Sequence, residues 1–470
     1  MSPPSGGFRI EKDTLGEVRV PADALWGPRT QRAVEAFRIS GLRPHPAFVR
    51  GVVLIKKAAA LANAEAGRLS VERRDAIVRA CDEILAGKHA EQFVIDPFQA
   101  GAGVSHHMNV NEVIANLANE IAGHPRGSYA LVTPEDHVNM GQSTNDVIPT
   151  AIRLASLELS RPLVVELEHL AAAFAAKAKE FSNVVKPGRT HLQDAVPMTL
   201  GQEFGGYAGV VRDAAGRIGH ARRASLALGI GGTAAGTGLN ADPKLRDRII
   251  GYLHEWTGEH LQGARDLFTA MQSMAPAVEL SGALRGAAIE LSKIANDLRI
   301  LVSGPRTGFG EIYLPVIQPG SSIMPGKVNP VMPEMLDMVC YQVIGNDEAV
   351  AWSAQAGQLE LNVMMPEIAF ALCFSLEILT SAIRTFRERC VVGITADAER
   401  AKWWIEQSPP LLVTALSPHI GYAKAADLAK RALEERKTLL EVALDEKVMP
   451  EADLRRILDP LPMTKGGVQE

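Results

Sequence analysis

The chain has 470 residues, of which 47% are hydrophobic and 22% are charged, and its formal net charge at pH 7 is −5. This ordinary composition excludes the strongly basic surface that nucleic-acid-binding proteins need. Aromatic residues make up only 5% of the chain, whereas alanine and leucine are abundant, and this balance favours helix over sheet.

The cysteines and the first residues bear on the compartment. Cys81, Cys340, Cys373 and Cys390 show no paired spacing, so we expect reduced and mostly buried thiols. Met1–Phe8 is rich in Pro, Gly and Ser and lacks the apolar core of a signal peptide. We expect no run of the roughly 18 apolar residues that a membrane span needs. A cytoplasmic protein that binds no membrane and no nucleic acid is therefore expected.

The first part of the chain mixes short elements. Phe8–Gly41 has short alternating pieces around turns, which predict a small hairpin-like cap. Pro46–Ala64 and Val71–Leu85 have the apolar spacing of amphipathic helices. Gln99–Met108 is interpreted as a Gly-rich turn, and Asn109–Ile121 as a helix.

The middle of the chain is dominated by long helical patterns. They cover Asp146–Phe181, Thr199–Leu228, Asp266–Val302, Asn329–Trp352 and Leu361–Cys390. Several carry small or apolar residues on nearly all faces, and such helices need partners on all sides. We expect an extended bundle whose helices also contact other subunits, with a monomeric bundle as the alternative.

Two polar segments separate these helices. The sequence pattern changes after about Ile394. Val185–Pro197 is expected to be a polar loop, and Gly229–Asn240 a Gly-rich turn. After Ile394 the helices become short and charged. The chain is therefore expected to be all-α, with three domains. They are an N-terminal domain (1–142), a central helical bundle (143–393) and a small helical C-terminal domain (394–470).

Three segments resemble known binding motifs, but their spacing or their place in the sequence excludes the corresponding site. Gly229–Ala234 fits a dinucleotide-binding pattern but follows a helix rather than a strand. Gly320–Lys327 resembles a phosphate-binding loop, but its spacing is one residue too long and Val328 replaces the required Ser or Thr. His106 and His107 are adjacent and would not face one metal, so we expect polar contacts rather than ligation. No metal and no cofactor are expected.

Four polar segments between long helices carry the remaining chemistry. They are Gly101–Asn109, His137–Asp146, Lys186–Asp194 and Gly320–Asn329. Lys327 and Asn329 offer a cation and an amide, which together suit one carboxylate. Removal of a proton beside a carboxylate creates an enolate-like dianion, whose charge needs preorganised hydroxyls, amides and a cation. A serine can be the base if backbone N–H groups stabilise its oxyanion.

Each of these residues also has a plain structural interpretation. Thr144 or Asn145 could only cap the helix that follows. His191 alone could be a surface histidine, and Lys327 alone a solvated lysine. Elimination next to a carboxylate is the function that uses them together.

Gly320–Pro330, which reads Gly-Ser-Ser-Ile-Met-Pro-Gly-Lys-Val-Asn-Pro, resembles the signature loop of the aspartase/fumarase superfamily. Gly188–Asp194, Gly201–Glu203, Gly236–Asn240 and Asn109–Asn116 also resemble that family in order and spacing. The resemblance covers nearly the whole chain. It implies a central bundle of five long helices between smaller N- and C-terminal domains. It further implies a homotetramer with a twenty-helix core, active sites built from three subunits, a small amino or hydroxy dicarboxylate substrate and no cofactor.

The resemblance also implies a role for each candidate residue. Ser321 would remove the Cβ proton, with His191 and Lys327 as the other catalytic residues. The contacts to the substrate would come from Ser143, Thr144, Asn145, Thr190, Ser322, Met324, Asn329, Val104 and His107. Within that set, Lys327 and Asn329 would hold the α-carboxylate, and Asn145 would contact the leaving group. Glu334 would pair with His191 across a subunit boundary.

The branch of the family is indicated by a few positions. Thr144 and Asn329–Glu334 (Asn-Pro-Val-Met-Pro-Glu) resemble the aspartate ammonia-lyases more than the fumarases. Val104 stands where those enzymes have a threonine, and His107 where they have an asparagine. We therefore expect a carbon–nitrogen lyase that converts L-aspartate to fumarate through an enediolate. A superfamily lyase with another amino acid substrate, a class II fumarate hydratase and an inactive structural homologue are the alternatives.

Overall fold

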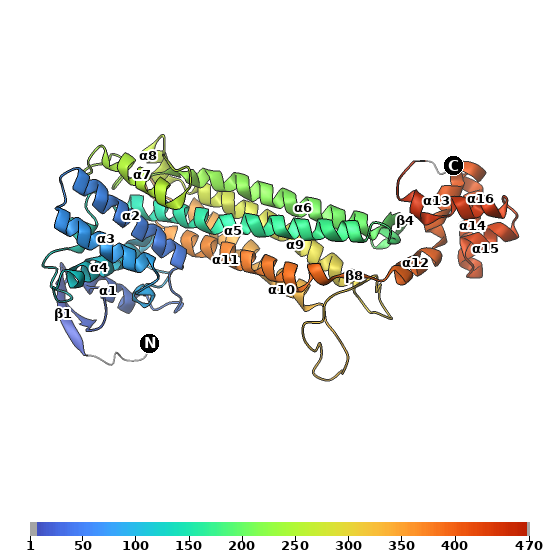
Figure 1. Ribbon diagram of the computed structural model, residues 1–470, viewed down its shortest axis with the longest axis horizontal. Helices are drawn as coiled ribbons and strands as arrows, with labels where there is room; N and C mark the ends of the chain where they lie inside the picture. The colour runs from blue at the N-terminus through green and yellow to red at the C-terminus, as the bar shows by residue number, and fades with distance from the viewer. Residues whose placement is uncertain (1–6, 468–470) are drawn as a thin grey trace. The chain divides into compact units, whose positions relative to one another are not determined.

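The structure is a computed structural model that describes residues 7–467 (Figure 1). The expectation about a signal peptide in Met1–Phe8 therefore lies almost wholly outside the described residues. The chain divides into two compact units. Unit 1 comprises Met1–Val164, Gly216–Gly286 and Tyr341–Thr380, and unit 2 comprises Val165–Ala215, Ala287–Cys340 and Ser381–Glu470. These divisions fall within long helices, so the predicted boundaries at 142/143 and 393/394 remain a prediction.

Unit 1 begins with the predicted hairpin. Strand β1 (Phe8–Asp13) pairs antiparallel with β2 (Gly16–Pro21), and helix α1 (Pro28–Ala36) follows. The buried Glu112 accepts hydrogen bonds from the Thr30 backbone N–H at 3.1 Å and the Thr30 hydroxyl at 2.6 Å. A carboxylate at this position satisfies N–H groups that the first turn of α1 would otherwise leave unpaired.

Three further helices of unit 1 pack in sequence. Helix α2 (Pro46–Glu65) contacts α3 (Val71–Leu85), and α3 contacts α4 (Val104–Ile121). Ser70 caps α3 by accepting a hydrogen bond from the Arg73 backbone N–H at 3.4 Å. The two predicted helices are confirmed to within one residue.

The predicted turn over Gln99–Met108 is wrong in its second half, because α4 already begins at Val104. Gly103 precedes it with a φ of 86°, a backbone conformation that favours glycine. All residues from Ser105 to Asn119 are buried. Polar residues in a helix that is buried all round resemble a loop in sequence, and this explains the error.

Five long helices run side by side in Figure 1, and each contributes residues to both units. They are α5 (Thr144–Glu180), α6 (Leu200–Ala221), α9 (Ala275–Leu301), α10 (Val331–Gln355) and α11 (Met365–Arg389). In unit 2, an aromatic cluster joins three of them, with ring centroids 5.5–6.5 Å apart: Phe174, Phe204, Tyr207 and Phe386. The predicted all-α bundle of five long helices is confirmed.

The predicted helix over Asp266–Val302 is interrupted. Asp266 caps a short helix, α8 (Leu267–Gln272), and Ser273 adopts an extended conformation before α9 begins. Pro276 lies in the first turn of α9, and proline disfavours helical backbone at the residue that precedes it. Two residues, Ser273 and Met274, therefore separate two helices where a continuous one was expected.

The predicted loop over Val185–Pro197 is a β-hairpin in unit 2. Strands β3 (Val185–Thr190) and β4 (Gln193–Thr199) pair antiparallel. His191 and Leu192 form the two-residue turn, and both have positive φ values, 55° and 56°. This is the geometry of a tight hairpin turn.

The remaining elements are short. They are α7 (Leu245–Thr257), β5 (Ala227–Leu228), β6 (Gln262–Gly263), β7 (Ile312–Tyr313), β8 (Thr395–Ala396), α12 (Ala398–Glu406), α13 (Pro409–Ile420), α14 (Tyr422–Glu435), α15 (Leu439–Asp445), α16 (Glu451–Ile457) and α17 (Pro460–Met463). The last helices surround their own apolar cluster, which includes Leu416, Leu439 and Leu454. The change to short helices after Ile394 is confirmed.

The expectation about apolar runs needs correction. Met365–Gly393, which contains α11, is long and apolar enough by length and composition to cross a membrane. However, 61% of its most apolar window is buried inside the protein. A core helix has the same composition, so its place in the bundle accounts for this one. The four cysteines are free and buried, as predicted.

Candidate active site

The unit 1 part of the site forms where α4 and α5 begin. His107 lies one turn into α4, and its Nδ1 is 2.7 Å from Oγ1 of Thr144, the first residue of α5. Gly103 lies against Ile148 of α5, and a Cβ at that glycine would be 3.2 Å from the Ile148 side chain. Val104 is 42% exposed, whereas His107 is buried. The structure thus brings the predicted residues of the two segments together.

A buried carboxylate positions the segment before α5. Asp146 accepts a hydrogen bond from the Ser143 backbone N–H at 3.0 Å, and from the N–H groups of Gly231 and Thr233 at 3.0 Å each. Burial raises the pKa of Asp146 to about 6. The side-chain amide of Asn145 donates to the Ala234 carbonyl at 2.8 Å. The Gly-rich turn therefore fixes the predicted substrate-binding segment 143–145.

The helix α5 is capped by Ser143 and Asp146, and not by Thr144 or Asn145 as the alternative interpretation proposed. The Ser143 hydroxyl accepts from the Asn145 N–H at 3.2 Å, and Asp146 bonds back to Ser143. These two residues form the cap of α5. Thr144 uses its hydroxyl on His107 instead, so it is available for a role beyond capping.

Sequence reasoning missed Lys56, a residue of α2 with no exposed surface. Its Nζ donates to Asn139 Oδ1 at 2.8 Å and lies 2.6 Å from His107 Nε2. Burial lowers the pKa of Lys56 to about 7. Burial, together with the positive charge of Lys56, also holds the pKa of His107 well below its usual range. No sequence signal distinguishes Lys56 from its neighbour Lys57.

The adjacent histidines have separate surroundings. The His106 ring stacks on Phe48 with centroids 4.6 Å apart, while His107 contacts Lys56 and Thr144. Burial lowers the pKa of His106 to about 3, so its ring is neutral at pH 7. Between residues 7 and 467, no three His, Cys, Asp or Glu side chains gather as metal ligands would.

In unit 2, Thr190 and His191 lie at the exposed tip of the β3–β4 hairpin. The base of this hairpin is held by charges. The buried Glu311 pairs with Lys186 at 3.4 Å and Arg189 at 2.7 Å. The rigid base fixes the position of the tip within its own unit.

The loop Gln318–Pro330 also belongs to unit 2. The Ser321 hydroxyl accepts hydrogen bonds from the backbone N–H groups of Ile323 at 3.2 Å and Met324 at 3.0 Å. The neck of the loop is closed by Gly320, whose N–H donates to the Lys327 carbonyl at 2.9 Å. The Asn329 amide donates to the Gly320 carbonyl at 2.5 Å. Ser321 therefore has the backbone donors that a serine base requires.

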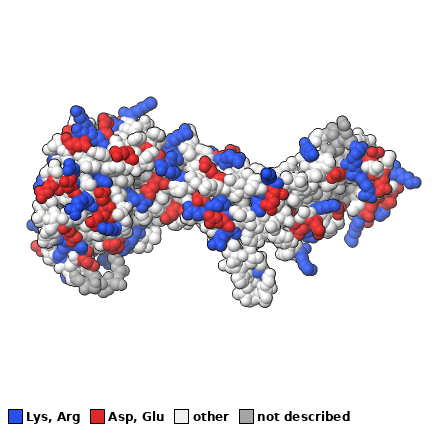
Figure 2. Space-filling model, viewed as in Figure 1, with Lys and Arg blue, Asp and Glu red and all other residues white. Residues whose placement is uncertain are grey.

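This loop is apolar and exposed. Ile323 is 83% exposed, and Met324 and Val328 are about half exposed. Lys327 is the one charged residue between residues 312 and 333. In Figure 2 the loop is accordingly almost free of blue and red.

Lys327, Asn329 and Glu334 line one cavity of about 790 Å³ in unit 2, together with Asn296 and Arg299. The structure therefore gathers the predicted carboxylate clamp around one hollow. Among the described residues of this single chain, no ion pair joins Glu334 to His191. The predicted residues thus fall into two groups, one in each unit.

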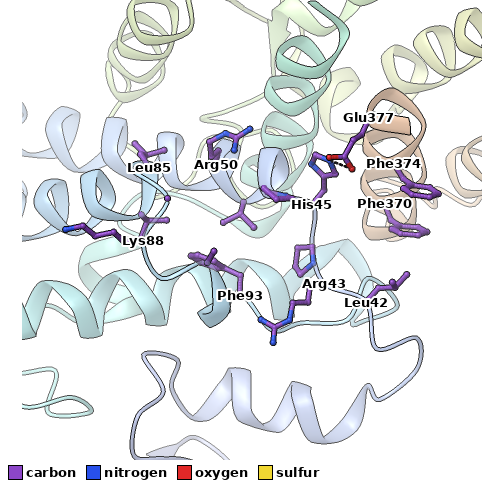
Figure 3. Close-up of a pocket in the computed structure, with 16 residues that line it drawn as sticks. Leu42, Arg43, His45, Arg50, Leu85, Lys88, Phe93, Phe370, Phe374 and Glu377 are labelled. Atoms are coloured by element: carbon purple, nitrogen blue, oxygen red, sulfur yellow. Dashed lines mark ion pairs between the residues drawn. The ribbon is translucent and has the colours of Figure 1, made fainter. Parts of the chain in front are cut away.

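A second cavity, of about 590 Å³, lies in unit 1 (Figure 3). Apolar side chains such as Phe93, Phe370 and Phe374 line it, and His45 pairs with Glu377 at 3.4 Å. It holds none of the predicted site residues.

Comparison with known proteins identifies the family. Residues 16–345 match the lyase family, and residues 412–465 match the fumarase C C-terminus. The aspartate ammonia-lyase of Bacillus subtilis is 46% identical over 98% of this chain and 97% of the relative. That of Pseudomonas aeruginosa is 49% identical over 97% of each chain.

Solved structures agree with this result. A fumarate lyase:delta crystallin from Brucella melitensis bound to cobalt superposes with a TM-score of 0.94 at 48% identity, covering 97% of this chain and 99% of that one. A class II fumarase from Schistosoma mansoni superposes with a TM-score of 0.93 at 36% identity, with the same coverage. The chain therefore belongs to the aspartase/fumarase superfamily of lyases.

Proposed function

We propose that this chain is an aspartate ammonia-lyase, a carbon–nitrogen lyase that eliminates ammonia from L-aspartate to give fumarate. The observation that carries the proposal is the Ser321 hydroxyl on two backbone N–H groups, in a loop that also holds Lys327. Relatives named aspartate ammonia-lyase are 46–49% identical over nearly the full length, which supports this substrate.

The first step is removal of the Cβ proton. Ser321, as an oxyanion held by the N–H groups of Ile323 and Met324, takes this proton. The electron pair moves into the neighbouring β-carboxylate and creates an enediolate dianion. A base matched and positioned in this way contributes about 10²- to 10⁴-fold to the rate.

The dianion is stabilised at the start of α5. Ser143 and Thr144 stand at this helix N-terminus, and Ser322 would add a third hydroxyl from the loop. The N-terminus of a helix carries partial positive charge and favours an anion. Since the charge on the β-carboxylate develops during the reaction, these contacts strengthen in the transition state.

The second step expels ammonia from Cα. The electron pair of the enediolate forms the double bond, the β-carboxylate is restored, and the amine leaves near Asn145. Lys327 and Asn329 hold the α-carboxylate throughout, with Thr190, His191 and Met324 beside the substrate. His191 and Glu334 would form their pair only between subunits. These steps use side chains of the protein and require no cofactor.

We further propose a cytoplasmic homotetramer with active sites shared by three subunits. Large apolar side chains on α10 are exposed in the single chain, including Met338 at 65%, Tyr341 at 57% and Trp352 at 66%. Exposed apolar surface of this kind marks contact sites. Separate chains would also explain why the two groups of site residues lie in different units.

A second candidate substrate is favoured by one observation. Val104 presents an exposed isopropyl group beside His107, where the aspartate ammonia-lyases have a threonine. A substrate with a larger, less polar β-substituent would suit this surface better than aspartate does.

One assay separates the candidates. Purified protein is mixed with L-aspartate, L-malate or bulkier amino acids, and the absorbance of the unsaturated product is followed. Aspartate should give fumarate and malate should not. Turnover of another amino acid without turnover of aspartate would contradict the proposed substrate, and turnover of malate would favour a fumarase.

A further inference from the structure

A chain of three side chains connects the interior of unit 1 to the candidate site. Lys56 Nζ lies 2.6 Å from His107 Nε2, and His107 Nδ1 lies 2.7 Å from Thr144 Oγ1. Lys56 and His107 are fully buried, whereas Thr144 is half-buried. The buried end of this Lys56–His107–Thr144 chain therefore leads to a hydroxyl that a substrate can reach.

The chemistry of the three side chains decides which of them donates and which accepts in each hydrogen bond. Below its pKa of about 7, Lys56 is a charged ammonium with donors and no acceptor, so Nε2 of His107 accepts from Lys56. A neutral imidazole that accepts at Nε2 carries its proton on Nδ1. Nδ1 therefore donates to Thr144 Oγ1, and the hydroxyl proton of Thr144 is left to donate elsewhere. Within residues 7–467, the Thr144 hydroxyl has no other hydrogen-bond partner.

We propose that Lys56 is a positioning residue, which fixes the tautomer of His107 and thereby turns the Thr144 hydroxyl into a donor toward the substrate carboxylate. This inference rests on the proposed function for the identity of the carboxylate. Lys56 acts through His107 and does not touch the substrate itself.

The surroundings of Lys56 argue against a purely structural role. A buried cation normally has a carboxylate partner, because burial of an unpaired charge is costly. Among the described residues, no carboxylate lies within ion-pair distance of Lys56, and its contacts are Asn139 and His107. Asp146 is close enough to affect its pKa without pairing with it. Functional sites are where such unfavourable placements are retained.

The neighbouring lysine supplies a matched control. Lys57 pairs with Asp82 at 2.6 Å and lies over the Trp256 ring, away from the candidate site. The comparison is between Lys56→Met and Lys57→Met, with steady-state formation of fumarate from L-aspartate. Lys56→Met should lower kcat by about ten- to a hundred-fold with little change in KM, since the lost contact strengthens in the transition state. Lys57→Met should leave both unchanged.

Substitution of His107 tests which group donates and which accepts in the Lys56–His107–Thr144 hydrogen bonds. Asparagine can accept from Lys56 through its carbonyl and donate to Thr144 through its amide, whereas leucine can do neither. His107→Asn should therefore lose several-fold less kcat than His107→Leu. His107→Leu should lose as much as Lys56→Met. Equal losses in His107→Asn and His107→Leu would overturn the proposal.

A second readout does not depend on activity. In protein labelled with ¹³C and ¹⁵N histidine, NMR shifts distinguish the two neutral tautomers, and His107→Asn assigns the signal. The wild-type protein should show the Nδ1–H tautomer at pH 6, and Lys56→Met should lose this preference. An Nε2–H tautomer in the wild-type protein would overturn the proposal. If the wild-type protein does not convert aspartate, the proposed function fails, and this measurement still decides the tautomer.

Discussion

The two groups of candidate residues differ in how firmly the chain holds them. In unit 1, His107 and Asp146 are buried and each makes at least two hydrogen bonds. In unit 2, the loop around Ser321 is exposed, and Ile323 at its tip is 83% exposed. The first group is positioned by the fold of the single chain. In the second group, the hydrogen bonds at the neck of the Ser321 loop lie within the loop itself, between Gly320 and residues Lys327 and Asn329.

This difference separates two tasks. In the proposed mechanism, the rigid group would receive the charge that develops on the substrate, and such preorganised donors need no rearrangement during the reaction. The exposed loop would bring the proposed base, Ser321. Loops that carry catalytic residues often move to close a site. A surface that covers Ile323 and Met324 would complete the site, and we attribute it to another subunit.

The largest loss of activity is expected for a substitution of Ser321, the proposed base in the exposed loop. Ser321→Ala removes the proposed base and should lower kcat for aspartate by about a thousand-fold. The side chain lies in an exposed loop, so the Tm should stay unchanged. Steady-state kinetics and thermal unfolding check both statements. Activity above a tenth of the wild-type value would assign the base to another residue.

The next effect concerns the cation of the same loop. Lys327→Met removes a charge-assisted hydrogen bond to the α-carboxylate. Such a bond contributes about 1.5–3 kcal/mol of binding free energy. This carboxylate is bound before and during the reaction, so KM should rise by about ten- to a hundred-fold while kcat changes less. Lys327→Arg, which keeps the charge, is the matched control. A fall in kcat alone would place Lys327 at the developing charge instead.

A smaller effect is expected in the rigid group, at Val104. Val104→Thr adds a hydroxyl beside the His107–Thr144 contact, and should raise kcat/KM for aspartate up to about tenfold. If the natural substrate has an apolar β-substituent, the same change should lower its kcat/KM. A substrate panel measured on both proteins decides between these outcomes.

The smallest effect is on stability. Burial lowers the pKa of Lys56 to about 7 from its ordinary value of 10.5. Between these values the unfolded chain binds more protons than the folded chain. The free energy of unfolding therefore rises with pH in this window, by on the order of 1.4 kcal/mol per pH unit. Lys56→Met lacks this contribution.

Thermal unfolding at pH 7, 8 and 9, at one protein concentration, measures this contribution. The Tm of the wild-type protein minus the Tm of Lys56→Met should increase as the pH rises. A constant difference would show that Lys56 keeps its ordinary pKa in the folded protein.

The sequence predicted the helices well where one face is apolar. Val71–Leu85 was predicted with the bounds that α3 has, because its periodicity and its Ser70 cap are local signals. The start of α4 was missed, since a helix buried on every side can carry Ser105–Asn109 without any periodic pattern. The β3–β4 hairpin was missed because two prolines in its strands are typical of a loop.

The site was predictable where its residues share one segment. Ser321, Lys327 and Asn329 stand within nine residues, and their chemistry is complementary without any knowledge of the fold. Lys56 and Asp146 were not predictable in this way. Lys56 meets His107 across 51 positions of sequence, and only the packing of α2 against α4 creates that contact.

The most direct test of the central claim, that the two groups form one site across different chains, is complementation. Thr144→Val disables the unit 1 group, and Ser321→Ala disables the loop of unit 2. The two inactive variants are mixed, dissociated and reassembled, and fumarate formation from L-aspartate is measured. If sites are shared between chains, random reassembly in a tetramer should restore about a quarter of the sites. Absence of any restored activity, in a sample that has re-formed its oligomer, would contradict the account.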